Sequence, residues 1–308
     1  MVMMNYPSLE EIIGNTPIVR LRHLPARYQV ADTVNVLAKL EGHNPGGSVK
    51  DRAALAMILA AEQKGLLKPG DRLIEASSGN TGIALAMAAC LRGYKITIVM
   101  PDNLSQERRD VMTAYGADIV LTPAAQGGME LARDTAQQLQ AQGKGIILNQ
   151  FANPANPQAH IMGTGPEIWQ QTQGTITHFV SAMGTTGTIM GTSTYLKQQN
   201  PAIQIIGVQP SPGAQITGIR KWSKGYEPEI YDAEQIDRLE YVEQQEAEVM
   251  TRQLAQVEGI FAGVSSGGAL VAALRVAASL KQGTVLFIVC DRGDRYVSSG
   301  LFQCPKSA

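Results

Sequence analysis

Short apolar runs alternate with longer segments of helical period from about residue 72 to the end of the chain. The short runs are rich in Ile, Val and Leu, as strands buried in a sheet are. They predict strands over 72–76, 95–100, 118–122, 146–150, 178–182, 203–208 and 284–290. The longer segments predict helices over 51–63, 81–91, 105–115 with Ser105 as its cap, 128–142, 164–172, 187–199, 245–258 and 268–280.

The repeated order of strand, helix and strand, with strands that are apolar along their length, predicts an α/β fold. Such strands form a mostly parallel sheet that helices cover on both faces. Ligands of these sheets bind at the carboxyl ends of the strands, where loops lead into helices. A boundary is expected near 151–157, which is rich in Pro and Asn. The segment 209–236 has no clear period, and an irregular stretch of this length is typical of a functional segment.

Composition and charge narrow the class of protein. The 308 residues suffice for two domains or one large α/β domain. With 26 Lys and Arg against 27 Asp and Glu, the chain lacks the basic surplus that nucleic-acid binding needs. No apolar run approaches the roughly 20 residues of a membrane span, and the first residues lack a secretory pattern. The three cysteines are far apart, which favours a reducing cytosol over a disulfide framework or a Cys-based zinc site.

A first candidate motif is NPGGSVKDR at 44–52, which places Lys50 at the start of an apolar helix. Pro and two Gly form a tight turn there, and the positive end of the helix dipole disfavours an ammonium group. Lys50 therefore loses its proton more readily, as a Schiff-base lysine must. Taken alone, a lysine is more often a solvated surface residue, so the motif by itself leaves both interpretations open.

Two small-residue turns follow predicted strands and open helices, SSGNTG at 77–82 and GTTGT at 184–188. Free N–H groups at a helix start bind anions, so the first turn suits a carboxylate and the second a phosphate. The second turn matches neither the Walker A loop nor the dinucleotide-binding pattern, and a single phosphate monoester fits it best. Each turn is also compatible with an ordinary helix cap.

The fourth motif is GVSSGG at 263–268, whose first five residues match the nucleophile elbow of α/β-hydrolases. That interpretation requires a histidine after the serine. All four histidines precede it and they do not cluster, which also predicts no metal site: His23, His43, His160 and His178. The hydrolase interpretation therefore fails, and the motif is either a structural helix start or a means of presenting the Ser265 hydroxyl to a ring atom of a ligand.

The four motifs, in this order and spacing, resemble those of the cysteine synthases. These are pyridoxal 5′-phosphate (PLP) enzymes of fold type II, in the tryptophan synthase β class. The likeness runs from GNTPIVRL at 14–21 to DRGDRY at 291–296, nearly the whole chain, and GIRKW at 218–222 resembles the B branch, which also uses thiosulfate. Ser77 stands where many relatives carry Thr, and Lys221 stands where the B branch can carry a second Arg.

Position by position, the resemblance implies a role for each motif residue. Lys50 matches the lysine that forms the Schiff base, Asn80 matches the residue that binds the ring hydroxyl of the cofactor, and Ser265 faces its pyridine nitrogen. The phosphate loop consists of Gly184, Thr185, Thr186, Gly187 and Thr188. The substrate-binding residues, most of them for the α-carboxylate and the last for thiosulfate, are Ser77, Ser78, Gly79, Thr81, Gln150 and Arg220.

The resemblance also implies the architecture. We expect two domains, each a mostly parallel twisted sheet with helices on both faces. The smaller, mobile domain is expected over 44–153, and the larger one over 1–43 plus 154–308. The family further implies a homodimer in the cytoplasm, with small molecules as substrates and neither nucleic acid nor a membrane as a partner.

The reaction implied is a step of cysteine biosynthesis. O-acetyl-L-serine and sulfide, or thiosulfate, give L-cysteine, or S-sulfocysteine, and acetate by β-replacement through an α-aminoacrylate. The free amine of Lys50 removes the α-proton. A serine/threonine dehydratase performs the same elimination but releases the aminoacrylate, and a non-catalytic protein on this fold is a further alternative. The SSGNT loop, the 218–222 segment and the intact Lys50 favour the synthase.

Overall fold

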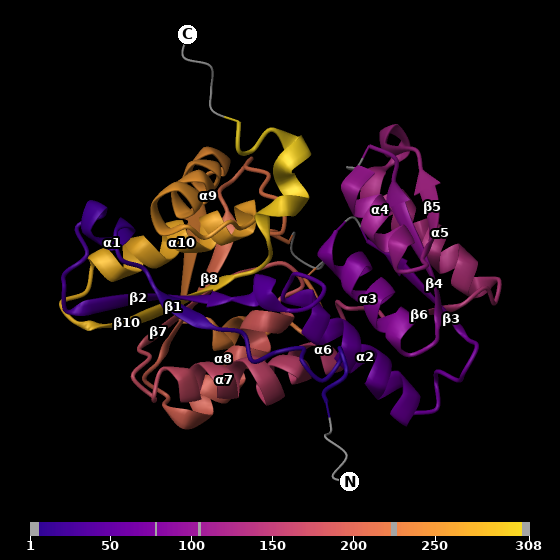
Figure 1. Cartoon of the computed structure of the whole chain (residues 1–308), viewed down its shortest axis with the longest axis horizontal. Coiled ribbons are helices and arrows are strands. Elements are labelled where there is room, and N and C mark those ends of the chain that lie inside the picture. The colour runs from indigo at the N-terminus through magenta and orange to yellow at the C-terminus, as the bar shows by residue number, and fades with distance from the viewer. Residues whose placement is uncertain (1–5, 78, 104–105, 223–226, 304–308) are drawn as a thin grey trace. The chain divides into compact units, whose positions relative to one another are not determined.

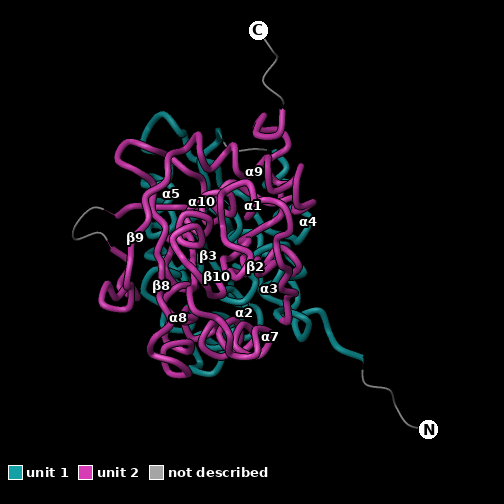
Figure 2. Tube along the Cα trace, turned by 90° about the vertical axis from the view of Figure 1, so that its left-hand side faces the viewer, with its two compact units in different colours: residues 1–14, 44–156 teal, residues 15–43, 157–308 magenta. Residues whose placement is uncertain are grey.

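The computed structural model describes residues 6–77, 79–103, 106–222 and 227–303 (Figure 1). The chain divides into two compact units, which Figure 2 draws in different colours. Unit 1 consists of residues 1–14 and 44–156, and unit 2 consists of residues 15–43 and 157–308. The main difference from the expected domains is that residues 1–14 belong to unit 1, where the Gly14 amide donates to Asn44 Oδ1 at 2.8 Å.

Unit 1 is built on a parallel four-stranded sheet in the order β5-β4-β3-β6. Its strands are β3 (Arg72–Ala76), β4 (Lys95–Pro101), β5 (Asp118–Thr122) and β6 (Ile146–Ile147). Its helices are α2 (Lys50–Gln63), α3 (Asn80–Leu91), α4 (Gln106–Ala114) and α5 (Gly128–Ala141). Leu73 packs in one apolar cluster with α2 and α3, and its neighbour Ile74 packs in another with α5. Because successive strand residues point to opposite faces, helices cover both faces of this sheet.

Unit 2 is built on a six-stranded sheet in the order β1-β2-β10-β7-β8-β9, in which only the β1–β2 pair is antiparallel among the described strands. The strands are β1 (Ile18–Arg20), β2 (Val34–Leu40), β7 (His178–Ala182), β8 (Gln204–Pro210), β9 (Arg238–Val242) and β10 (Gly283–Val289). The helices are α1 (Leu24–Arg27), α7 (Gly165–Gln171), α8 (Gly187–Gln199), α9 (Gln244–Glu258) and α10 (Val264–Ala278). A short α6 (Ala155–Ala159) and a π-helical turn (His160–Thr164) precede α7.

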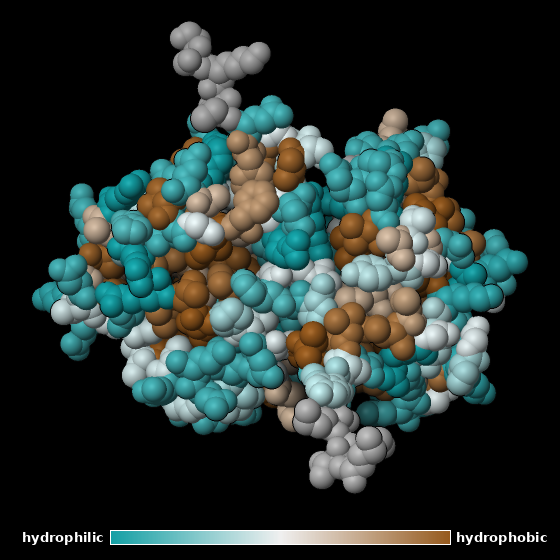
Figure 3. All heavy atoms as spheres, viewed as in Figure 1, coloured by the Kyte–Doolittle hydropathy of each residue, from teal (hydrophilic) through white to brown (hydrophobic). Residues whose placement is uncertain are grey.

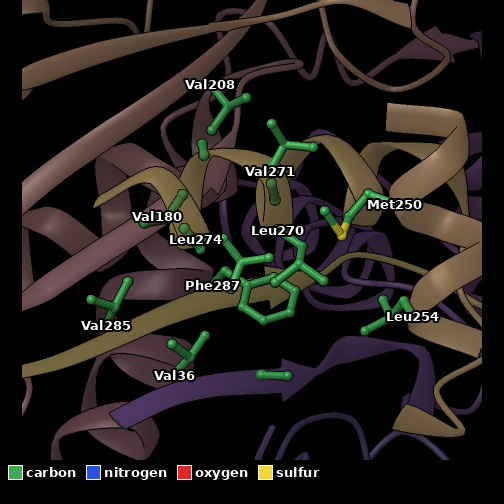
Figure 4. Packing of buried hydrophobic residues seen from close by; sticks show 14 of the residues in the cluster. Val36, Val180, Val208, Met250, Leu254, Leu270, Val271, Leu274, Val285 and Phe287 are labelled. Carbon is green, nitrogen blue, oxygen red and sulfur yellow. The ribbon is translucent and has the colours of Figure 1, made fainter. Parts of the chain in front are cut away.

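The core of unit 2 lies on both sides of β10, in the middle of the sheet. Phe287 of β10 packs with Leu270 and Leu274 of α10 in the larger cluster, as Figure 4 shows. Its neighbours Leu286 and Ile288 belong to a second cluster with residues of α7 and α8. The alternation along β10 again predicts helices on both faces. The expected fold class, a mostly parallel α/β architecture of PLP fold type II, is confirmed.

The expected elements occur with small shifts of their bounds, and two of the shifts matter for the site. The strand expected over 146–150 ends at Ile147, so Gln150 lies in a turn beyond β6. The helix expected from residue 268 begins at Val264, so Ser265 lies in its first turn. The proposed cap Ser105 lies outside the described residues.

Three strands of unit 2, β1, β2 and β9, are absent from the sequence prediction. In β2 a charged residue, Lys39, interrupts the apolar pattern. Lys39 is nevertheless fully buried, and it pairs with Glu167 of α7 at 2.7 Å. A lysine in an apolar run argues against a buried strand until its partner is known, and this partner is 128 residues away.

The surface drawn in Figure 3 carries hydrophobic areas separated by hydrophilic residues. Within the described ranges, no helix is long and apolar enough to cross a membrane.

Candidate active site

Lys50 begins α2 and follows a tight turn. The Gly47 amide closes the turn by donating to the Asn44 carbonyl at 2.7 Å, and Gly47 has a φ of 81°, in the region that favours glycine. The Asp51 carboxylate accepts from the Gly46 amide at 2.6 Å, and a Cβ on Gly46 would lie 2.6 Å from Asp51 Oδ1. The turn is therefore held against the first turn of α2, where Lys50 stands half-buried.

Ser77 caps α3 from the loop that follows β3. Its Oγ accepts from the Gly82 amide at 2.9 Å. Asn80 and Thr81 occupy the first turn of α3, where the first N–H groups of a helix lack intrahelical partners and favour an anion. The remaining residues expected in this loop are Gly79, which is the N-cap of α3, and Ser78, which lies outside the described residues.

Gln150 is joined to this loop by a hydrogen bond. Thr81 Oγ1 donates to Gln150 Oε1 at 2.8 Å, although the two residues are 69 positions apart. Gln150 Nε2 in turn donates to Oε1 of Glu75, in β3, at 3.0 Å. All three side chains are buried. The structure therefore brings the expected loop and Gln150 together and adds Glu75 to them.

The carboxyl group of Glu75 is an unusual member of this set. Burial raises its pKa to about 7. The hydrogen bond from Gln150 and the positive charge of Arg133 lower the pKa, but by less than burial raises it. Its Oε2 is buried without a hydrogen-bond partner in the described ranges. A buried carboxyl group is costly to ionise, so Glu75 changes its protonation state close to neutral pH.

In unit 2 the loop 184–188 connects β7 to α8. Thr186 is the N-cap of α8 and has a left-handed backbone, with φ 71° and ψ −11°. Thr188 lies in the first turn of α8, and its Oγ1 is 3.3 Å from Nε2 of the buried His160. The Nδ1 atom of His160 is 2.8 Å from Thr164 Oγ1, at the end of the π-helical turn. The start of α8 is thus held by a side-chain contact with the π-helical turn.

The Thr186 hydroxyl tests whether this loop suits a phosphate. Its Oγ1 is buried and has no hydrogen-bond partner among the residues that the structure describes. A buried hydroxyl in that state costs about 1–3 kcal/mol. A phosphate oxygen at the start of α8 would accept its hydrogen bond together with those of the helix N–H groups, so the residues present fit this group.

Ser265 lies near Gly218. Ser265 is buried in the first turn of α10, and a Cβ on Gly218 would lie 3.1 Å from Ser265 Cβ. Gly218 also has a φ of 87°, so the position needs glycine for two reasons. A Cβ on Gly184 would lie 3.1 Å from the Gly218 carbonyl oxygen. The phosphate loop, Gly218 and Ser265 therefore meet within unit 2.

Arg220 belongs to the same neighbourhood. Its backbone amide donates to the Met183 carbonyl at 2.7 Å, and Trp222 Nε1 donates to the Gly184 carbonyl at 3.1 Å. The guanidinium carbon of Arg220 lies 5.3 Å from the centre of the Trp222 ring, and Arg220 is exposed. The irregular segment is thus hydrogen-bonded to the phosphate loop at residue 222 and to the residue directly before that loop at residue 220.

The expected site residues fall into two sets, one in each unit. Unit 1 holds the lysine, the carboxylate loop and Gln150, and unit 2 holds the phosphate loop, Ser265 and Arg220. Sequence reasoning missed Glu75 and His160 as members of these sets. The signal for Glu75 was its position, a single acidic residue inside the otherwise apolar end of a strand directly before the SSGNTG loop.

Comparison with known proteins shows the family of this chain. The family described as pyridoxal-phosphate dependent enzyme matches residues 9–291. The chain is 58% identical to cysteine synthase B of Pseudomonas aeruginosa over 298 residues, which cover 97% of this chain and 98% of that protein. It is 55% identical to cysteine synthase B of Escherichia coli over 295 residues, 96% of both chains.

Solved structures show the same fold. A cysteine synthase from Entamoeba histolytica superposes with a TM-score of 0.92 at 36% identity, over 100% of this chain and 94% of that one. An O-ureido-L-serine synthase superposes with a TM-score of 0.90 at 38% identity, over 99% of this chain and 98% of that one.

The chain therefore belongs to the pyridoxal-phosphate dependent enzymes and, within them, to the cysteine synthases. The resemblance drawn from the four motifs, the enzyme class and the cofactor are confirmed. The roles of the individual residues stay predictions, which the geometry above makes testable.

The raised pKa of Glu75 predicts a pH-dependent stability. Between pH 5 and pH 8 the folded state, with a pKa of about 7, binds more protons at this group than the unfolded state, whose ordinary value is 4.5. The free energy of unfolding of the wild type should therefore fall by about 2–3 kcal/mol relative to that of Glu75→Gln as the pH rises through this window. Urea unfolding at four pH values measures the difference. The matched variant Glu62→Gln should not reproduce this fall, and a constant difference for Glu75→Gln would contradict the prediction.

The unpartnered hydroxyl of Thr186 predicts opposite effects on the free protein and on cofactor binding. Thr186→Val replaces the hydroxyl with a methyl group of similar size, so the cofactor-free protein should gain about 1 kcal/mol while the affinity for PLP falls roughly 10-fold. Unfolding of the cofactor-free protein and a PLP titration followed by absorbance measure the two effects. Thr192→Val, which removes a buried hydroxyl without a described partner on the same helix, should raise stability and leave PLP affinity unchanged. Equal effects of both variants on PLP would rule out a phosphate contact of Thr186.

Proposed function

We propose that this protein converts O-acetyl-L-serine and sulfide to L-cysteine and acetate, and that it also accepts thiosulfate to give S-sulfocysteine. The observation that carries the proposal is the identity of 55–58% to two cysteine synthases B over nearly the whole of each chain. The two sets of site residues supply the functional groups that this reaction needs.

Lys50 is proposed to carry the reactive amine. When bound, PLP supplies an electron sink for the negative charge that develops at Cα of the substrate. Lys50 Nζ would hold the cofactor covalently, and the same amine, when free, would act as the base that takes the proton from Cα of the substrate. Lys50 lies at the start of α2, where the positive end of the helix dipole is an unfavourable place for a second positive charge.

The start of α3 is proposed to bind the α-carboxylate of the substrate. Ser77, Ser78, Gly79 and Thr81 supply the small-residue loop, with Gln150 beside it and Asn80 toward the ring hydroxyl of the cofactor. Support comes from the cap that Ser77 provides and from the hydrogen bond between Thr81 and Gln150. Orienting the substrate by its carboxylate places the Cα–H bond for removal of the proton.

In unit 2, the loop Gly184–Thr188 is proposed to hold the phosphate, and Ser265 to face the pyridine nitrogen. A serine hydroxyl is neutral, so Ser265 would supply no negative charge to stabilise a proton on that nitrogen. The cofactor would then be a weaker electron sink, which would favour loss of the acetate from Cβ over transamination. Support comes from the buried Thr186 hydroxyl and from the proximity of Ser265 to Gly218.

Arg220 is proposed to distinguish thiosulfate from sulfide. A guanidinium binds two oxygens of a sulfonate-like group in a fork, and sulfide offers no such acceptors. Support comes from the anchoring of the Arg220 backbone to Met183 and from the ring of Trp222 close to its guanidinium.

The protein is further proposed to act in the cytoplasm as a homodimer, for which sedimentation at micromolar concentration is the test.

The reaction itself is tested with the purified PLP-bound enzyme. O-acetyl-L-serine alone should change the absorbance of the cofactor, and sulfide should reverse the change with formation of one cysteine per acetate. A serine/threonine dehydratase would instead release pyruvate without needing sulfide. Pyruvate as the main product would therefore overturn the proposal.

Lys50→Ala should leave the fold intact and abolish the covalent bond to the cofactor. Borohydride reduces a Schiff base to a stable link, so the wild type should gain the mass of PLP on the peptide that contains residue 50, and the variant should not. Turnover should fall more than roughly 1,000-fold, as expected for loss of the central base and nucleophile. Lys64→Ala, at the other end of α2, is the matched control. Wild-type turnover by Lys50→Ala would remove this lysine from the mechanism.

Arg220→Ala should weaken the thiosulfate reaction and spare the sulfide reaction. The loss expected for a charged hydrogen bond is about 1.5–3 kcal/mol in kcat/KM for thiosulfate. Both donors are measured on one preparation, with Arg238→Ala as a control for an exposed arginine of the same unit. Equal losses for both donors would mean that Arg220 acts on folding, and its role in donor recognition would be dropped.

A further inference from the structure

Glu75 is a buried acidic residue that the proposed chemistry does not use. It lies in β3 between the buried Ile74 and the loop that begins at Ser77. Its Oε1 accepts from Gln150 Nε2 at 3.0 Å, and Gln150 Oε1 accepts from Thr81 Oγ1 at 2.8 Å. The three side chains form one continuous chain of hydrogen bonds from the carboxyl end of β3 to the start of α3.

This chain of hydrogen bonds fixes the orientation of the Gln150 amide. Oε1 of Glu75 accepts the hydrogen bond from Gln150, and an acceptor oxygen at this place selects the nitrogen end of the amide. The oxygen end of the amide is then left for the Thr81 hydroxyl. Gln150 stands in a turn beyond the two-residue strand β6, where strand pairing no longer holds it. Its backbone carbonyl accepts from Asn156 Nδ2 at 2.8 Å, so both its backbone and its side chain are positioned by hydrogen bonds.

The fixed orientation leaves one hydrogen-bond donor for a ligand. An amide nitrogen carries two hydrogens, and the contacts described above use one of them on Glu75. Turning the amide by half a revolution would place its oxygen against the acceptor oxygen of Glu75 and would break this hydrogen bond. Gln150 is hydrogen-bonded to Thr81, in the first turn of α3. Its remaining N–H is therefore close to the N–H groups of that helix start, which also favour an anion.

We propose that Glu75 is a positioning residue that holds the amide of Gln150 with one N–H directed to the α-carboxylate of the amino acid substrate. The inference rests on the proposed function, because it assigns Glu75 to the substrate site of that reaction. Glu75 does not touch the substrate. It acts through Gln150, and its effect should therefore appear in substrate binding and vanish when Gln150 is absent.

The free-energy cost of burying the Glu75 carboxyl group indicates that the group is present for a functional reason. A buried acidic side chain near the end of β3 loses its hydration, and an apolar residue of similar size would be less costly there. Arg133, on α5, is the charged group that acts on Glu75, and its guanidinium lies 4.6 Å from the centre of the Phe151 ring, next in sequence to Gln150. Glu75 and Arg133 therefore both contact the turn that holds Gln150, Glu75 through the Gln150 amide and Arg133 through the Phe151 ring.

The test is a double-mutant cycle with Glu75→Leu and Gln150→Leu in the PLP-bound enzyme. Glu75→Leu should raise KM for O-acetyl-L-serine roughly 10-fold, change kcat less than about 2-fold and leave KM for sulfide unchanged. In the Gln150→Leu background the same change should have no further effect, because contacting residues in one network do not act additively. Glu75→Gln, which keeps an acceptor oxygen, should recover most of the wild-type KM. Additive effects in the cycle, or losses confined to kcat, would overturn the positioning role.

A second variant covers the case in which Glu75→Leu does not fold. The exchange Glu75→Gln with Gln150→Glu allows both hydrogen bonds to form but replaces the N–H donor with a carboxylate. It should fold, and binding of L-alanine, followed by the absorbance of the cofactor, should weaken more than 10-fold relative to wild type. Wild-type affinity in the exchanged protein would refute the inference. Turnover of O-acetyl-L-serine by the wild type tests the proposed function separately, because the L-alanine measurement needs no reaction.

Glu62→Gln is the matched control for both experiments. It also removes a hydrogen-bonded carboxylate from unit 1, but it lies near the end of α2 opposite Lys50, paired with Arg92 at 2.7 Å. The control should leave KM for O-acetyl-L-serine and the affinity for L-alanine at their wild-type values.

Discussion

The functional groups of this protein depend on one physical constraint, which is that the first N–H groups of a helix have no intrahelical partners. In unit 1 the N–H groups of α3 begin directly after β3, and in unit 2 those of α8 begin after β7. Small residues fill both connections, so that a ligand can approach the backbone. An amino acid carboxylate and a phosphate are both anions, and the two helix starts suit them for the same electrostatic reason.

These helix starts also explain where the structure carries local costs. Thr186 adopts a left-handed backbone and leaves a buried hydroxyl without a described partner, and Glu75 carries a carboxyl group into the interior of unit 1. None of these features stabilises the fold by itself. Each of these costs is explained if the group contacts a ligand, or orients a residue that contacts a ligand.

Much of this could be predicted from the sequence, because the relevant signals are local. The strands of unit 1 are short apolar runs, and the turns at 77–82 and 184–188 combine glycine with hydroxyl side chains directly after a strand. The family followed from the order of such turns. What could not be predicted depends on partners distant in sequence. The buried Lys39, which interrupts the apolar pattern of β2, pairs with Glu167, and Glu75 is hydrogen-bonded to Gln150, 75 residues away. His160 likewise reaches Thr188 only through the packing of the π-helical turn against α8.

The most direct test of this account is a crystal structure of the PLP-bound enzyme. The account predicts that the phosphate of PLP lies at the start of α8, accepts from the N–H groups of residues 185–188 and takes the hydrogen bond of Thr186 Oγ1. It also predicts continuous density between Lys50 Nζ and the cofactor. A phosphate bound elsewhere, with the Thr186 hydroxyl still without a partner, would contradict the claim that the helix starts define the site.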